Sequence, residues 1–263
     1  MSGTAAAARG PRGPAAVIAG LTGVTLVCWI LTARLMGGMD AGPGTPLGGF
    51  AGFLVSWTVM MAAMMLPAEL RFTLAFAQFA RTEATRPALA VIFFLGGYLL
   101  CWGGFGALAW LGDRGLRAVF APVLAWDAWG PETTGTVLAI AGLYQVSRWK
   151  QACLDHCISP FAFFVQHWRP GLRGALRMGL AHGAYCIGCC WSLMLVLFAL
   201  GIMSLYWMTL LALAMFAEKV LPVGRGYARG LALGLVVLGV WVAVAPATVP
   251  GLVQPGAVTG HAH

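Results

Sequence analysis

The segment LRMGLAHGAYCIGCCWSLMLVLFAL, residues 176–200, contains a single formally charged side chain, Arg177. An apolar run of about 20 residues is long enough to cross a bilayer as an α-helix. This run nevertheless carries a histidine and three cysteines, at positions 182, 186, 189 and 190. Polar groups at membrane depth are costly and usually functional. The segment therefore predicts a membrane-spanning helix that contains a functional site.

The rest of the chain has the same character. Of its 263 residues, 60% are hydrophobic and 9% are charged, whereas a soluble domain carries about 25% charged residues. No stretch of about 50 residues is polar enough to form a soluble domain. The fold class expected is therefore all-α, a polytopic transmembrane helical bundle in the lipid bilayer. The net charge of +8 does not predict nucleic-acid binding, because basic residues mark the cytoplasmic loops of membrane proteins.

Apolar runs predict about seven spans. The range is six to seven, because the fourth run has only about 15 clearly apolar residues. The second can continue past Pro67, and Leu116–Trp126 fits an interfacial helix. We expect one transmembrane domain over residues 15–248, with disordered tails at 1–14 and 249–263. The predicted spans are Ala15–Ala33, Leu47–Leu66, Pro87–Leu111, Thr133–Ser147, Leu176–Leu200, Met203–Val220 and Ala228–Pro246.

The distribution of Lys and Arg predicts the orientation of these spans. If the N-terminus is cytoplasmic, 13 of the 16 basic residues lie on the inside and three, Arg34, Arg114 and Arg117, lie outside. The chain is therefore expected in a bacterial inner membrane with its N-terminus in the cytoplasm. The loop KQACLDHCISP, residues 150–160, then lies on the cytoplasmic side with Cys153 and Cys157. There, thiols stay reduced.

Helical spacing in the fifth span places four candidate ligands on one face. His182, Cys186 and Cys190 follow i, i+4 spacing, and Cys189 is three residues after Cys186, so these side chains are neighbours on the helix surface. Thiolates favour Cu(I) or zinc, and imidazole binds either. The set predicts a metal site in the cytoplasmic half of the bundle, to which Cys153 and Cys157 contribute.

Methionines in the second span favour copper. The stretch TVMMAAMMLP, residues 58–67, has Met60, Met61, Met64 and Met65 near its cytoplasmic end. Thioethers select Cu(I), so copper as Cu(I) is preferred to zinc. The alternative is simple packing, since Met and free Cys often fill apolar cores; we assign that role to Cys28 and Cys101.

Charged and polar residues inside the apolar runs point to an inner polar region. Glu69 follows Pro67, and Glu218 and Lys219 close the sixth span, where they can also form a pair at the interface. Tyr144 and Gln145 could orient a ligand or anchor the fourth span at the membrane surface. Gly226, Gly230 and Gly234, at and just before the start of the seventh span, form a small-residue face that suits either the bundle or a homo-oligomer.

Three stretches together resemble a bacterial family of predicted metal-binding integral membrane proteins of unknown function, sometimes labelled copper chaperone-like. They are MMAAMMLP from residue 60, YQVSRWKQACLDHC from residue 144, and HGAYCIGCCWSLMLVLFALGIMSLYWMTLLALAMFAEKV from residue 182. The resemblance covers Ser56–Leu221 and implies metal binding. Ile158 stands where the family pattern usually has a basic residue, which argues against an acidic-partner role for this loop.

The function expected is capture of Cu(I) by Cys, His and Met side chains and its delivery to or from a metal-donor or metal-acceptor protein. Transport is a variant of this function, but only Met203 and Met208 offer ligands toward the outside. The alternative is a membrane thiol-disulfide oxidoreductase, in which Cys186 and Cys189 exchange electrons with a quinone. A purely structural subunit is the third class, which the density of cysteines argues against.

Overall fold

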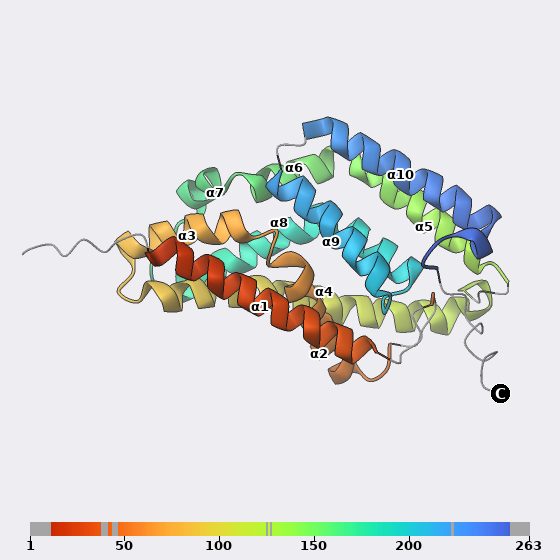
Figure 1. The fold of residues 1–263 in the computed structure, drawn as a ribbon, viewed down its shortest axis with the longest axis horizontal. Coiled ribbons are helices and arrows are strands. Elements are labelled where there is room, and N and C mark those ends of the chain that lie inside the picture. Colours follow the sequence, from red (N-terminus) through yellow and green to blue (C-terminus); the bar gives the residue numbers. More distant parts are fainter. Residues whose placement is uncertain are drawn as a thin grey trace, which may run out of the picture.

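The computed structural model describes residues 12–37, 42–43, 47–124, 126, 128–221 and 224–252, and within these residues the secondary structure is entirely helical. The helices pack lengthwise into one elongated bundle (Figure 1). They are α1 Arg12–Met36, α2 Phe50–Met65, α3 Leu70–Glu83, α4 Pro87–Leu124, α5 Gly130–Gln145, α6 Arg148–Ile158, α7 Pro160–His167, α8 Gly171–Leu200, α9 Leu205–Val220 and α10 Gly224–Val244, followed by the 3₁₀-helix η1 Pro246–Thr248. The predicted all-α fold class is confirmed.

Four of these helices, α1, α4, α8 and α10, are long and apolar enough to cross a membrane. The pair α2 and α3 passes the same test jointly but is bent by 86° between its halves, which raises the number to five at most. The predicted fourth and sixth spans correspond to α5 and α9, which have 16 residues each. The prediction of seven spans is therefore not confirmed.

The break between α2 and α3 occupies residues 66–69, around Pro67. Proline lacks an N–H and clashes with the carbonyl four residues earlier, so an α-helix bends or ends there. The break brings Glu69 to the N-cap of α3, where its side chain is only 2% exposed. A kink that the sequence predicts at Pro67 thus places a carboxylate inside the bundle.

Helix α8 is the central element. Over its most apolar 18 residues, 56% of positions are buried, against 17%, 28% and 22% in α1, α4 and α10. Glycines allow its closest contact: a Cβ at Gly179 would lie 2.0 Å from the carbonyl oxygen of Phe94 on α4. Because α8 is surrounded by other helices, its polar and sulfur-containing side chains face protein.

Helices α5 and α10 also pack through glycines, but these glycines differ from the ones that the sequence analysis predicted to form a packing face. A Cβ at Gly135 would lie 2.5 Å from the Gly239 carbonyl oxygen. The predicted small-residue face of Gly226, Gly230 and Gly234 has no atom within 4 Å of the added Cβ positions. The bundle therefore does not use that face.

The other predicted boundaries differ modestly from the structure. The segment expected as a separate interfacial helix, Leu116–Trp126, is largely continuous with the third predicted span, because α4 runs from Pro87 to Leu124 with one non-helical residue at Phe120. Residues 1–11 and 253–263, which make up most of the two predicted tails, lie outside the described residues. Helix α1 begins at Arg12.

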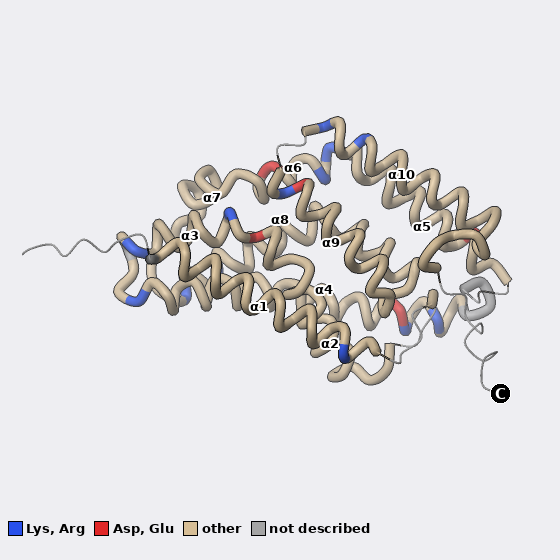
Figure 2. Tube along the Cα trace, in the orientation of Figure 1, with Lys and Arg blue, Asp and Glu red and all other residues tan. Residues whose placement is uncertain are grey.

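Basic residues gather near the left end and along the upper edge of the bundle as drawn in Figure 2, a region that we call the basic end. They lie around the α3–α4 connection and where α6, α9 and α10 come together. The opposite end, which holds the α1–α2 and α4–α5 connections, shows few. The basic residues are therefore unevenly distributed over the bundle.

Candidate metal centre

Three cysteines of α8 bring their sulfurs together in the core. The Sγ atoms of Cys186, Cys189 and Cys190 all lie within 4.8 Å of one another, and each residue is at most 1% exposed. Cys189 Sγ is 3.4 Å from Cys190 Sγ and donates to the Cys186 carbonyl oxygen at 3.2 Å. The i, i+3 and i, i+4 spacing of an α-helix produces this cluster. We refer to these three residues as the thiol cluster.

A fourth thiol joins from α6. Cys157 Sγ lies 3.8 Å from Cys189 Sγ, and Cys157 is 7% exposed. Cys153, one helical turn earlier, is half-buried and faces Gly188 of α8, where an added Cβ would lie 2.6 Å from Cys153 Sγ. All seven cysteines of the chain are free. The two predicted groups of cysteines, two residues on α6 and three on α8, therefore meet at one interface.

Helix α6 is fixed in this position by a buried lysine. Ser147 caps the helix by accepting a bond from the Lys150 backbone N–H, and the Lys150 ammonium reaches Glu218 Oε2 on α9 at 2.7 Å. The same ammonium donates to Gln145 Oε1, whose amide donates to Ser192 on α8 at 3.1 Å. Lys150, Gln145, Glu218 and Ser192 are all buried, so this set ties α6 to α5, α8 and α9.

A second buried ion pair contacts the thiol cluster directly. Lys219 Nζ lies 2.9 Å from Cys186 Sγ and 2.9 Å from Glu69 Oε1. Glu69 Oε2 in turn lies 2.5 Å from His182 Nε2, and the Tyr98 hydroxyl is 3.1 Å from Cys186 Sγ. Buried charges are costly unless they are paired and hydrogen-bonded, and an ammonium beside a sulfur favours the thiolate. The arrangement is suited to holding Cys186 as an anionic ligand.

Glu218 and Lys219 therefore do not form the interfacial pair that the sequence allowed. Both side chains are buried, and each forms an ion pair with a different residue. Glu218 pairs with Lys150, and Lys219 pairs with Glu69. Tyr144 also faces inward: its hydroxyl donates to the Gly188 carbonyl oxygen at 2.6 Å. This bond holds the backbone between Cys186 and Cys189.

His182 lies one turn before Cys186, but it is not part of the thiol cluster. Its ring stacks on Phe72, with centroids 3.7 Å apart, and its Nε2 contacts Glu69. Its Nδ1 is buried without a hydrogen-bond partner among the described residues. The Glu69 carboxylate thus orients the His182 ring, as carboxylates commonly do for histidines that bind a metal through their other ring nitrogen.

The four methionines of α2 are all at most 1% exposed and belong to the same packed core as Cys157 and the thiol cluster. Met194, Met208 and Met215 belong to it as well. Met60, Met61, Met64 and Met65 are therefore buried in the same core as the cysteines. Cys28 and Cys101, assigned to packing, are half-buried on α1 and α4.

The sequence alone missed Tyr98, Lys150 and Ser192. Tyr98 and Ser192 sit in apolar helices without a distinguishing pattern, and Lys150 looked like one more basic residue of a cytoplasmic loop. The only usable signal was for Lys150, which lies at the first turn of a helix that also carries two cysteines.

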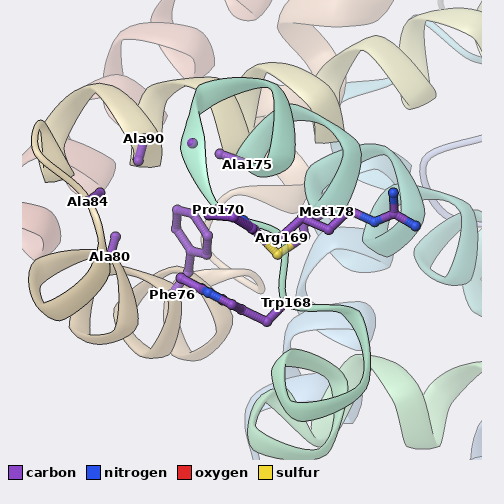
Figure 3. Close-up of a pocket in the computed structure, with 10 residues that line it drawn as sticks. Phe76, Ala80, Ala84, Ala90, Trp168, Arg169, Pro170, Ala175 and Met178 are labelled. Atoms are coloured by element: carbon purple, nitrogen blue, oxygen red, sulfur yellow. The ribbon is translucent and has the colours of Figure 1, made fainter.

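A small pocket lies between the start of α8 and the helices α3 and α4 (Figure 3). Aromatic and small side chains line it, with Met178 as its only sulfur and Arg169 as its only charged residue. It contains none of the described cysteines, so it is separate from the thiol cluster. The candidate metal centre is enclosed by packed side chains instead.

A family model described as PpoB2, copper chaperone, matches residues 54–242. This span includes α8 and both buried ion pairs, and it is well over half of the 263 residues. The chain belongs to this copper chaperone family. The match supports metal binding and copper as the metal, in agreement with the resemblance that the three sequence stretches carry. No curated protein and no solved structure matches the chain.

Proposed function

We propose that this copper chaperone family member is an integral membrane protein that binds Cu(I) at the thiol cluster and Cys157, and exchanges it with a partner protein. The observation that carries the proposal is the convergence of three buried sulfurs within 4.8 Å of one another on the central helix. Cu–S bonds are similar in length to the ~2.3 Å of Zn–S bonds, so one ion can contact more than one of these sulfurs after small side-chain rotations.

Copper as Cu(I) is supported by the donor set. Thiolates and thioethers are soft ligands that select Cu(I), and Met60, Met61, Met64 and Met65 share the core with the cysteines. His182 stays a predicted ligand through Nδ1, which has no partner among the described residues. A monovalent ion bound by one thiolate and neutral ligands has no net charge, which suits an apolar environment.

The proposed membrane arrangement is seven crossings with the N-terminus in the cytoplasm. In it, α5 and α9 are short spans of about 24 Å at 1.5 Å per residue, and α2 with α3 is one broken span. The basic end of the bundle in Figure 2 is then cytoplasmic. Cys153 and Cys157 of α6 lie at that end, which suits exchange with a cytoplasmic partner.

The test is metal analysis of the purified protein in detergent, reduced and supplied with Cu(I) and Zn²⁺ in equal amounts. We expect bound copper in the unaltered protein and its loss in C186S/C189S. The matched control is C28S, which removes a half-buried thiol from α1 and should retain the copper. Equal copper in C186S/C189S and the unaltered protein would refute the site.

A further inference from the structure

The thiols of α6 and α8 become progressively less exposed toward the centre of the bundle. Cys153 is half-buried, Cys157 is 7% exposed and Cys189 is fully buried. Trp149, which lies four residues before Cys153 on α6 and so on the same helix face, is exposed. The series thus starts at a surface that a partner can reach and ends at the thiol cluster.

Successive members of this series are neighbours. Cys153 and Cys157 are four residues apart on α6, so they share one face of that helix. Cys157 Sγ is 3.8 Å from Cys189 Sγ. The missing side chain of Gly188 leaves room for Cys153 Sγ against α8, since an added Cβ would lie 2.6 Å from that sulfur.

We propose that Cys153 is the exchange thiol through which a thiol-bound Cu(I) donor loads the thiol cluster by way of Cys157. This inference rests on the proposed function and changes the predicted role of Cys153 from a final ligand to a transfer residue. The partner it fits is a small molecule or protein that carries Cu(I) on thiolates. Release to an acceptor follows the same series in the opposite direction.

The exchange is a ligand substitution without a redox step. Cys153 bonds to the copper of the donor complex, the bond from copper to the donor sulfur breaks, and the proton of the Cys153 thiol passes to the departing donor thiolate. The same substitution then moves the ion to Cys157 and to Cys189. Copper remains Cu(I), and each thiol deprotonated on one side is matched by one protonated on the other.

Cys101 shows that partial exposure and contact with α8 do not by themselves make a cysteine an exchange thiol. It is also half-buried and contacts α8, where an added Cβ at Gly183 would lie 2.7 Å from the Cys101 Cβ. It lies in the middle of the long apolar helix α4, which the proposed arrangement covers with lipid. Cys101 is therefore a matched control for Cys153: a half-buried thiol against α8 that an aqueous donor does not reach.

The experiment is stopped-flow loading of the reduced full-length protein with Cu(I)–glutathione, followed by copper–thiolate absorption, beside an equilibrium titration against a Cu(I) chelator. C153S should slow loading by about tenfold or more without changing the equilibrium affinity, while C101S should load at the unaltered rate. G188A, which displaces the Cys153 thiol without removing it, should also slow loading.

Unchanged loading in both C153S and G188A would overturn the proposal. So would a loss of equilibrium affinity in C153S, because that result makes Cys153 a final ligand. If the unaltered protein bound no Cu(I) in the titration, the proposed function itself would fail, so the two failures are distinguishable.

Discussion

The Lys219 ammonium lies 2.9 Å from both the Cys186 sulfur and a carboxylate oxygen of Glu69. It therefore links the bent helix pair α2–α3 to the thiol cluster through α9. Its position explains how a lysine and a glutamate are accommodated in the core of an apolar bundle: each compensates the charge of the other, and both contact groups of the candidate metal centre.

Replacing Lys219 with Met should reduce both stability and Cu(I) affinity. Removal of one partner from a buried ion pair costs about 3–5 kcal/mol, and Cys186 would lose the cation that favours its thiolate. Thermal unfolding in detergent and Cu(I) titration measure the two effects. The double variant E69Q/K219M should regain much of the stability, because no charge is left uncompensated, but not the affinity. Full affinity in K219M would contradict this role.

Glycine packing between α4 and α8 should be sensitive to a single methyl group. G179A places a Cβ 2.0 Å from the Phe94 carbonyl oxygen, and overpacking of this kind costs about 1–3 kcal/mol. The control is G230A on α10, where no atom lies within 4 Å of the new Cβ. Thermal unfolding should rank G179A well below G230A, and equal stability of the two variants would argue against the observed helix crossing.

The proposed membrane orientation predicts which thiols can be labelled from outside the cell. In intact cells, a membrane-impermeant maleimide should not modify Cys153, although permeabilised cells should show modification. Burial raises the pKa of the Cys153 thiol, so labelling is best done at mildly alkaline pH, where more thiolate is present. W129C provides the control, because Trp129 is 61% exposed at the opposite end and should label in intact cells. Ready labelling of Cys153 in intact cells would show that the orientation is the reverse of the proposed one.

That reversal would favour the alternative function, a thiol-disulfide oxidoreductase. In such an enzyme, Cys186 and Cys189 would form a disulfide when a quinone is supplied, and Cys153 and Cys157 would pass electrons to it. We expect no quinone-dependent loss of free thiols in the purified protein, measured by thiol counting. A disulfide between Cys186 and Cys189 that forms only with quinone would support the enzyme instead.

Local features of the site were predictable from the sequence, whereas its partners were not. The convergence of Cys186, Cys189 and Cys190 follows from helical spacing alone, and the break at Pro67 from the chemistry of proline. The contacts of Glu69 with His182 and Lys219 join residues that are 113 and 150 positions apart in the sequence. The periodicity of a helix relates only residues a few positions apart, so it cannot predict such contacts. His182 was therefore predicted only as a ligand, and its carboxylate partner emerged from the fold.

The predicted number of spans is not confirmed, for a similar reason. Hydropathy marks apolar segments but not how far a helix extends once neighbouring helices pack against it. Helix α8 starts five residues before the predicted Leu176, whereas α9 starts two residues after the predicted Met203. Gly171 at the start of α8 and Gly201 before α9 have φ angles of 77° and 116°, a conformation that residues other than glycine rarely adopt.

The central claim is that the thiol cluster binds Cu(I) in preference to Zn²⁺. The most direct measurement is a titration of the reduced protein with Cu(I) against a competing chelator, run beside a Zn²⁺ titration, for the unaltered protein, C186S/C189S and C28S. The account predicts tighter binding of Cu(I) than of Zn²⁺, loss of Cu(I) binding in C186S/C189S, and no change in C28S. Zn²⁺ binding as tight as that of Cu(I), or undiminished Cu(I) binding in C186S/C189S, would contradict it.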